Sequence, residues 1–259
     1  AIRNAVAVGA DPDHIALLDN FCWGDPTRPE TLGTLVDAAR GCYDAALHYR
    51  APFISGKDSL NNEYLGTDGQ RHAIPPTLLI SAIGIIEDVN KAVTMDLKEV
   101  GNIIYLLGKI EAISNLQSSI SNYAPKLYRA LHRAIQNGLV RACHDLSEGG
   151  LAVAAAEMCI GGRLGLSLTI NEKESLQPVI PSGVSPRGIS ETVKEIPRYA
   201  RNDILKEDLF TETNSCLLIE VREKDCATFE SFFDNLPFQR LGTVSTEQQL
   251  NISTVDQSL

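Results

Sequence analysis

Apolar residues recur in two patterns along the chain, and together these patterns predict a protein of both strands and helices. Short apolar runs predict strands over residues 14–19, 52–55, 75–87, 102–107, 139–143, 164–170, 217–221, 239–244 and 250–252. Apolar spacings of three and four predict helices over residues 1–8, 31–49, 123–137, 151–158 and 229–236.

Two of these elements have a distinctive apolar pattern. The helix over 31–49 gathers apolar residues on one face, formed by Leu32, Leu35, Val36, Ala39 and Tyr43. The run Pro75–Glu87, PPTLLISAIGIIE, is almost continuously apolar, which predicts a strand buried on both faces.

The pattern restarts near residue 100, which predicts two domains. We place the first at 1–98, as a sheet with helices, and the second at 99–259, as a mixed sheet covered by helices. Residues 172–208 carry four of the chain's twelve prolines and scattered charge without a sustained period. We therefore expect an exposed insert at about 174–204.

Composition narrows the class of protein. The 259 residues are 44% apolar, which is enough for a sizeable core, and the net charge of -10 disfavours binding to nucleic acid or anionic membranes. There is no run of 18 apolar residues and no basic, apolar N-terminus, so we expect a cytoplasmic enzyme without a membrane span or signal peptide. The six cysteines lack zinc spacing and are expected to be reduced. The chain begins without Met, inside a predicted helix, so we expect a piece of a longer polypeptide.

The stretch 139–162 combines a strand, the polar loop His144–Gly150 and an Ala-rich helix closed by Gly161-Gly162. Such a loop can hold phosphate through backbone N–H groups, and a carboxylate such as Asp145 can hold Mg²⁺. The alternative is an ordinary turn in which Asp145 or Ser147 only caps the helix. His144 is expected to be a positioned or core histidine rather than a base.

Two other predicted strands also end in polar residues, Asp19-Asn20 and Gly56-Lys57-Asp58-Ser59. Acidic, glycine and serine residues that recur at strand ends favour a nucleotide site. In the second group, Gly56 would allow close backbone approach, Lys57 would neutralise a phosphate, Ser59 would donate to it, and Asp58 could reach the metal. The tetrapeptide is not a P-loop, because that motif needs a glycine at the position of Ala51. Taken alone, it more commonly marks a polar turn.

Several motifs together resemble the phosphoribosylformylglycinamidine (FGAM) synthase family. They are DNFCWGDP at 19–26, FISGKDSLNNE at 53–63, PPTLLISAIGIIEDV at 75–89, the stretch 139–158 and LFTETNS at 209–215. The segment HDLSEGGLA is also similar to aminoimidazole ribonucleotide (AIR) synthetase and selenophosphate synthetase. The resemblance covers the chain except about 174–204, and it places the chain in the C-terminal half of the synthetase region. It implies an α+β, AIR synthetase-like fold.

The resemblance also implies a chemistry. In that family ATP phosphorylates the amide oxygen of formylglycinamide ribonucleotide, and ammonia from glutamine displaces the phosphate, with Mg²⁺ offsetting phosphate charge. It implies as partners the N-terminal half of the synthetase, a glutaminase domain or subunit, and a small-molecule substrate, with no nucleic acid and no membrane. The chain is expected to be inactive alone.

Matched motif by motif, Asn4 and Asp145 correspond to magnesium ligands of the family's long form, and Ser147 to a residue that touches ATP. Asp19, Gly56 and Ser59 correspond to ATP or substrate positions of the short form. Lys57 stands where the short form has a metal-binding Asn, which puts a metal at that spot in doubt and matches the long form's GKDS pattern. Two alternatives stay open: a noncatalytic half that binds a structural nucleotide, and another superfamily member such as selenophosphate synthetase.

Overall fold

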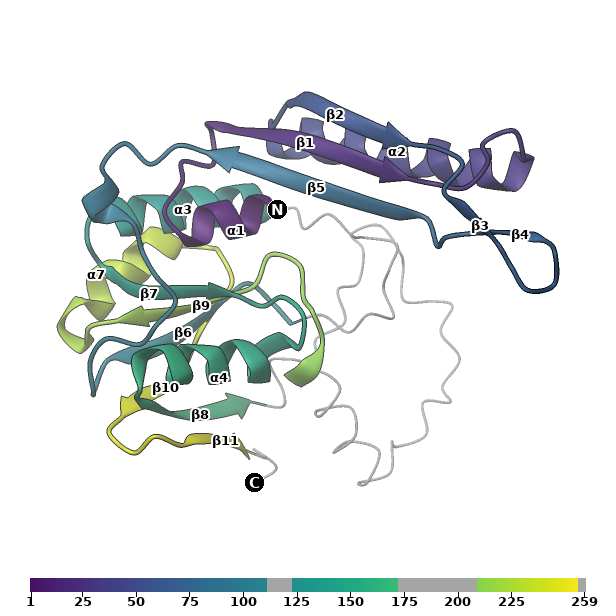
Figure 1. The fold of residues 1–259 in the computed structure, drawn as a ribbon. Coiled ribbons are helices and arrows are strands. Elements are labelled where there is room, and N and C mark those ends of the chain that lie inside the picture. Colours follow the sequence, from purple (N-terminus) through teal and green to yellow (C-terminus); the bar gives the residue numbers. More distant parts are fainter. Residues whose placement is uncertain (111–122, 172–208, 256–259) are drawn as a thin grey trace, which may run out of the picture. The chain divides into compact units, whose positions relative to one another are not determined.

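The computed structural model describes residues 1–110, 123–171 and 209–255, and these residues form two compact units (Figure 1). The first unit contains residues 1–92 and 128–136, and the second contains the remaining described residues. The expectation of an α+β protein is confirmed. The predicted insert at about 174–204 lies outside the described residues, and the predicted domain boundary near residue 98 stays a prediction.

The first unit is built on a three-stranded sheet with the order β2-β1-β5, in which β1 pairs parallel to β2 and antiparallel to β5. Helix α2 lies along one face of this sheet (Figure 1). Its elements are α1 (Ile2–Ala7), β1 (Ile15–Cys22), α2 (Pro29–Tyr49), β2 (Phe53–Ser59), β3 (Glu63–Leu65), β4 (Arg71–Ala73), β5 (Thr77–Gly84) and the 3₁₀ turn η1 (Val89–Lys91).

Helix α2 buries a different stripe from the predicted one. Half-buried positions recur at 31, 35, 38, 42, 45 and 49, and 46 and 48 are also half-buried near its end, whereas Leu32, Val36 and Tyr43 are exposed by 45%, 48% and 64%. Of the predicted apolar face only Leu35 is half-buried, so this face is not the one that packs on the sheet. The helix is apolar on two sides, and the buried side carries the smaller residues Ala38, Cys42 and Ala45, which allow a helix to approach a sheet closely.

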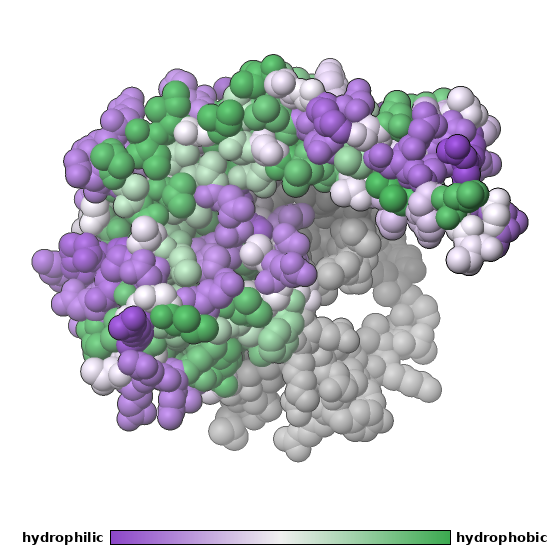
Figure 2. Space-filling view, in the orientation of Figure 1, coloured by the Kyte–Doolittle hydropathy of each residue, from purple (hydrophilic) through white to green (hydrophobic). Residues whose placement is uncertain are grey.

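Strand β5 is not buried on both faces, which corrects the prediction for Pro75–Glu87. Its residues alternate between exposed and half-buried, and Leu79 and Ile83 are 59% and 56% exposed. Hydrophobic residues reach the surface between hydrophilic ones in the space-filling view (Figure 2). Within the described part of this unit, α2 covers one face of the sheet only. Because side chains alternate along a strand, Leu79 and Ile83 lie on the other face and are exposed to solvent.

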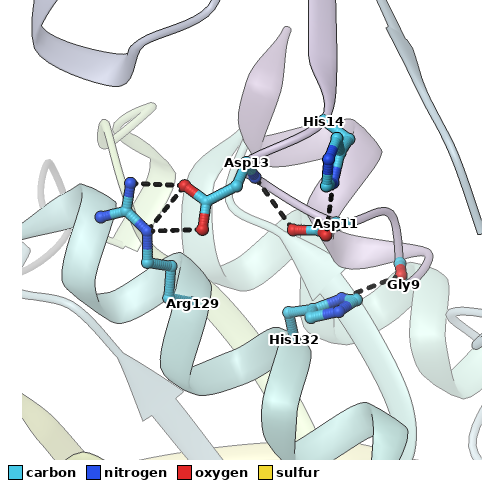
Figure 3. Close-up of polar contacts among 6 residues, drawn as sticks. All are labelled: Gly9, Asp11, Asp13, His14, Arg129 and His132. Carbon is cyan, nitrogen blue, oxygen red and sulfur yellow. Dashed lines mark hydrogen bonds and ion pairs between the residues drawn. The ribbon is translucent and has the colours of Figure 1, made fainter.

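A polar cluster ties the loop between α1 and β1 to helix α3 (Ala124–Gln136) (Figure 3). The guanidinium of Arg129 donates to both carboxylate oxygens of Asp13, over 2.6 to 2.9 Å. Nδ1 of His132 lies 3.3 Å from the carbonyl oxygen of Gly9, whose φ of 107° ends α1 as predicted. His14 pairs with Asp11 at 2.7 Å. The cluster therefore fixes the end of α1, the helix that carries Asn4.

The second unit contains a six-stranded mixed sheet with the order β11-β8-β10-β6-β9-β7, in which only β11 and β8 pair in parallel. The remaining elements are β6 (Ile103–Leu107), β7 (Val140–Asp145), α4 (Gly150–Gly162), β8 (Gly165–Asn171), β9 (Leu217–Val221), the 3₁₀ turns η3 (Glu223–Asp225) and η4 (Ser231–Phe233), α7 (Cys226–Glu230), β10 (Phe238–Ser245) and β11 (Leu250–Val255).

The two faces of this sheet are covered differently. Helix α4 packs on one face, where Leu151, Ala155 and Met158 are fully buried with strand residues such as Ile104 and Leu218. On the other face Tyr105 contacts the rings of Phe229 and Phe238, and Phe233 packs on both of these rings. The predicted helix over 229–236 is instead α7 followed by the turn η4, and these two elements supply Phe229 and Phe233 to the aromatic cluster.

Helix α4 closes at the predicted pair Gly161-Gly162, which are its last two residues. The left-handed C-cap is the next residue, Arg163, and not a glycine. A Cβ at Gly162 would lie 2.7 Å from the backbone nitrogen of Leu97, and this N–H donates to the carbonyl of Met158. Glycine is therefore needed for close packing of the segment that precedes β6.

The same segment is held by a buried carboxylate. Glu220 is fully buried in β9 and accepts hydrogen bonds from the N–H groups of Lys98 and Glu99 and from the side chain of Asn102, at 2.6 to 3.1 Å. Among the described residues, no helix is both long and apolar enough to cross a membrane.

Candidate functional site

The turn between β7 and α4 has a specific backbone geometry. Strand β7 ends at the buried Asp145, after which Leu146 turns into the core and donates its N–H to the carbonyl of Cys216 at 3.1 Å. The carbonyl of Ser147 then accepts from the N–H of Gly150 at 2.9 Å. The turn thus places a buried carboxylate and a half-buried hydroxyl just before the helix.

Helix α4 begins without a side-chain cap. Its N-cap is Gly149, in the left-handed conformation with φ 85°, so neither Asp145 nor Ser147 occupies that position. The alternative in which one of them is only a helix cap is therefore wrong. A Cβ at Gly150 would lie 2.6 Å from the carbonyl oxygen of Thr211. The segment 209–211 therefore lies against the helix start, and two motifs that are far apart in sequence meet there.

His144 connects this turn to the second half of α4. Its Nε2 lies 2.7 Å from Oε2 of Glu157, and its Nδ1 lies 3.4 Å from Oδ1 of Asp145. Proximity to Asp145, and then to Glu157, raises the pKa of the imidazole above its ordinary value of 6.5, although burial of the ring opposes this. The expectation of a positioned histidine agrees with this geometry. The sequence reasoning did not identify Glu157, although it is the only charged residue in α4.

In the first unit, Asp19 and the GKDS segment are parts of strands, which corrects the prediction that they form loops at strand ends. Strand β1 continues to Cys22 and β2 continues to Ser59, and the two strands pair in register along this stretch, with Asp19 opposite Gly56. Parallel pairing satisfies the backbone groups of residues whose polar side chains are typical of turns.

Strand alternation divides the predicted binding residues between two faces of this sheet. Asp19 lies on the face of the buried Leu17 and Phe21, and a Cβ at Gly56 would lie 2.7 Å from its carboxyl carbon. Gly56 and Asp58 share that face by register, whereas Lys57 and Ser59 lie on the opposite face. Lys57 Nζ donates to Ser59 Oγ. The structure therefore brings Lys57 together with Ser59, and Asp19 together with Gly56.

The DNFCWGDP stretch has a structural role that was not predicted from the sequence: it joins the end of β1 to α2 and to the end of β2. Trp23 is buried, donates its indole N–H to Thr34 in α2 at 3.0 Å, and its backbone pairs with Ser59 and Asn62. Glu63 accepts from the N–H of Asp25 at 3.2 Å. The motif therefore fixes the end of β2, where the GKDS segment lies.

The two predicted metal ligands belong to different units, Asn4 to the first and Asp145 to the second. Asn4 is exposed on α1 and Asp145 is buried. Within residues 1–110, 123–171 and 209–255, no three His, Cys, Asp or Glu side chains form a group that could hold a metal ion. Magnesium commonly takes one or two carboxylates and keeps several waters, so a single buried carboxylate at the end of β7 fits its chemistry. The roles of all predicted site residues stay predictions.

A family model for AIR synthase related protein, C-terminal domain, matches residues 99–254, which is more than half of the chain. The chain belongs to this family. The phosphoribosylformylglycinamidine synthase subunit PurL of Lactobacillus helveticus is 31% identical over 274 residues, which cover 100% of the chain and 32% of that protein. The PurL subunit of Gloeobacter violaceus is 35% identical over 215 residues, which cover 77% of the chain and 27% of that protein.

Solved structures share the fold. The chain is similar to a chain of the HypE–HypF complex, with a TM-score of 0.67 and 14% identity over 98% of this chain and 78% of that one. Thermotoga maritima PurL complexed with ATP gives a TM-score of 0.61 and 15% identity, over 98% of this chain and 37% of that one. The same protein complexed with FGAR gives a TM-score of 0.65 and 15% identity, over 98% of this chain and 39% of that one. The AIR synthetase-like fold is confirmed, and the chain spans about a third of the length of its curated relatives.

Proposed function

We propose that this chain belongs to the C-terminal half of the synthetase region of an FGAM synthase, a carbon–nitrogen ligase of purine biosynthesis. The observation that carries the proposal is the meeting of HDLSEGG with LFTETNS at the start of α4, within a chain that matches PurL subunits along its whole length. The reaction would use ATP, formylglycinamide ribonucleotide and ammonia derived from glutamine.

Within this proposal each predicted residue has a role. Asp145 would hold Mg²⁺, which supplies charge compensation for the phosphates of ATP, and Asn4 is likewise proposed as a magnesium ligand. Ser147 would donate to a phosphate beside the N-terminus of α4, where backbone N–H groups favour an anion. These groups act by positioning and by electrostatic stabilisation.

The strand residues would bind ATP or the ribonucleotide. Lys57 and Ser59, which share a sheet face, would contact a phosphate as a pair, because a lysine ammonium neutralises its charge and a hydroxyl orients it. Asp19 and Asp58 lie on the other face and would contact hydroxyl groups or the metal. Gly56 would keep Asp19 in place, since any side chain at that position would displace it.

The proposed partners are the other parts of the synthetase and a glutaminase domain or subunit, in the cytoplasm. PurL relatives are about three times as long as this chain, so we expect residues 1–259 alone to show no ATP turnover that depends on formylglycinamide ribonucleotide and ammonia.

The test is Asp145→Ala in the full-length synthetase. Loss of one carboxylate ligand should lower turnover by at least about tenfold, and Asp145→Asn should recover part of the activity at high Mg²⁺. Asp234→Ala removes an exposed carboxylate of the same unit and serves as the control. Wild-type kinetics in Asp145→Ala would exclude the metal role. ADP that survives purification and does not exchange with ATP would instead favour a structural nucleotide.

A further inference from the structure

His144 lies between two carboxylates that come from different elements. Glu157 on α4 is 2.7 Å from Nε2, and Asp145 at the end of β7 is 3.4 Å from Nδ1. The side chains of His144 and Asp145 are only 16% and 8% exposed, whereas that of Glu157 is 49% exposed. Both ring nitrogens therefore face a carboxylate, one at the surface and one in the interior.

The fold restricts the orientation of this ring. Ala142 lies two residues before His144 in β7 and is part of the core beneath α4, so alternation places the imidazole on the same face as that helix. Glu157 lies three positions after the buried Ala154 on α4, and its carboxylate reaches the ring from the helix. A contact at Nε2 stops rotation of the imidazole, and this in turn determines where Nδ1 points.

We propose that His144, held by Glu157, is a positioning residue that orients the carboxylate of Asp145 for Mg²⁺. The inference rests on the metal role proposed above for Asp145. Partners behind a ligating carboxylate fix its orientation, and their loss typically lowers metal affinity by about 10- to 100-fold. Glu157 on α4 holds the ring of His144, and His144 in β7 in turn holds the carboxylate of Asp145.

A purely structural role makes a different prediction. If the His144–Glu157 contact only joins α4 to β7, its loss should lower the melting temperature and leave the Mg²⁺ requirement unchanged. Metal dependence therefore separates the two roles.

The experiment uses the full-length synthetase with two isosteric variants. In His144→Asn the amide reaches the position of Nδ1 and can donate to Asp145, whereas in His144→Gln it reaches the position of Nε2 and can contact only Glu157. Glu157→Ala removes the outer partner, and Glu223→Gln, an exposed charge change in the same unit, is the control. The readouts are the Mg²⁺ concentration for half-maximal rate, Mn²⁺ affinity measured by electron paramagnetic resonance with ADP present, and the melting temperature.

We expect His144→Gln to raise the half-maximal Mg²⁺ concentration and weaken Mn²⁺ binding by about tenfold. His144→Asn should change both by less than about threefold, and Glu157→Ala should fall between them. A wild-type metal requirement in both His144→Gln and Glu157→Ala, with Asp145→Ala impaired, would overturn this inference and leave the proposed function standing. Unimpaired Asp145→Ala would instead exclude the metal role proposed for Asp145, on which this inference rests.

Discussion

The carboxylate of Asp19 lies directly over Gly56 of the neighbouring parallel strand, in the space that a side chain at that position would fill. A Cβ on Gly56 would lie 2.7 Å from the carboxyl carbon of Asp19, which is closer than real Cβ contacts come. The φ of Gly56 is not in the left-handed region, so glycine is needed here for space and not for its backbone conformation.

Gly56→Ala should therefore destabilise the protein by about 1 to 3 kcal/mol, since the added methyl group displaces Asp19 or separates β1 from β2. Urea unfolding would measure the change. Adding Gly56→Ala to Asp19→Ala should lower the free energy of unfolding much less than Gly56→Ala does in the wild-type protein, because the carboxylate that the methyl group would meet is gone. Gly33→Ala and Gly41→Ala in α2 are matched controls, because a Cβ there meets nothing within 4 Å, and each should be neutral or stabilising by up to about 1 kcal/mol. Equal effects at Gly33 and Gly56 would contradict the packing argument.

The pair of Asp13 and Arg129 should make stability depend on pH. Hydrogen bonds from Arg129 lower the pKa of Asp13 below its ordinary 3.8, so the ionised form is favoured in the folded state. The stabilisation is therefore fully present above about pH 3.8 and is lost as pH falls through the lowered pKa.

Asp13→Asn should lower the free energy of unfolding by about 1 kcal/mol at pH 7. This is the upper end of the range for a partly exposed ion pair, and we expect it because the contact is bidentate. The difference from wild type should shrink below pH 3.8. Asp37→Asn is the control, since its pair with Arg40 is 3.6 Å long and both side chains are more than two-thirds exposed, at 78% and 69%. Denaturant titrations from pH 2.5 to 7 would test both, and a constant difference across that range would disprove the linkage.

Glu220 should be far more sensitive to truncation than its exposed neighbours. Glu220→Ala leaves the buried N–H groups of Lys98 and Glu99 and the amide of Asn102 without their acceptor, so we expect a loss of about 3 kcal/mol or more. Glu220→Gln keeps one acceptor oxygen and should cost less. The melting temperature measures both changes. Glu99→Gln, at an exposed position, should have almost no effect, and a comparable loss there would show that the three hydrogen bonds are not responsible.

Local sequence determined the type of most elements, because their patterns need no distant partner. The continuous apolar runs of β6 and β9 and the Ala-rich pattern of α4 predict the observed strands and helix, and Gly9 ends α1 as predicted. The motifs also identified the AIR synthetase-like fold. Element boundaries were predicted less accurately: in place of the helix over 229–236 the structure has α7 over Cys226–Glu230 and then the turn η4.

Tertiary structure decided the faces, the strand ends and the contacts of the candidate site. Asp19 and the GKDS segment are typical of turns by composition, yet they lie in strands because each supplies the hydrogen-bonding edge that the other requires. The amphipathic pattern of α2 leaves two apolar stripes, and only the sheet selects the one that is buried. Position 162 of α4 needs a glycine because Leu97 approaches its backbone, and His144 meets Glu157 because α4 packs on β7. Each of these outcomes depends on residues distant in sequence, so local patterns could not determine them.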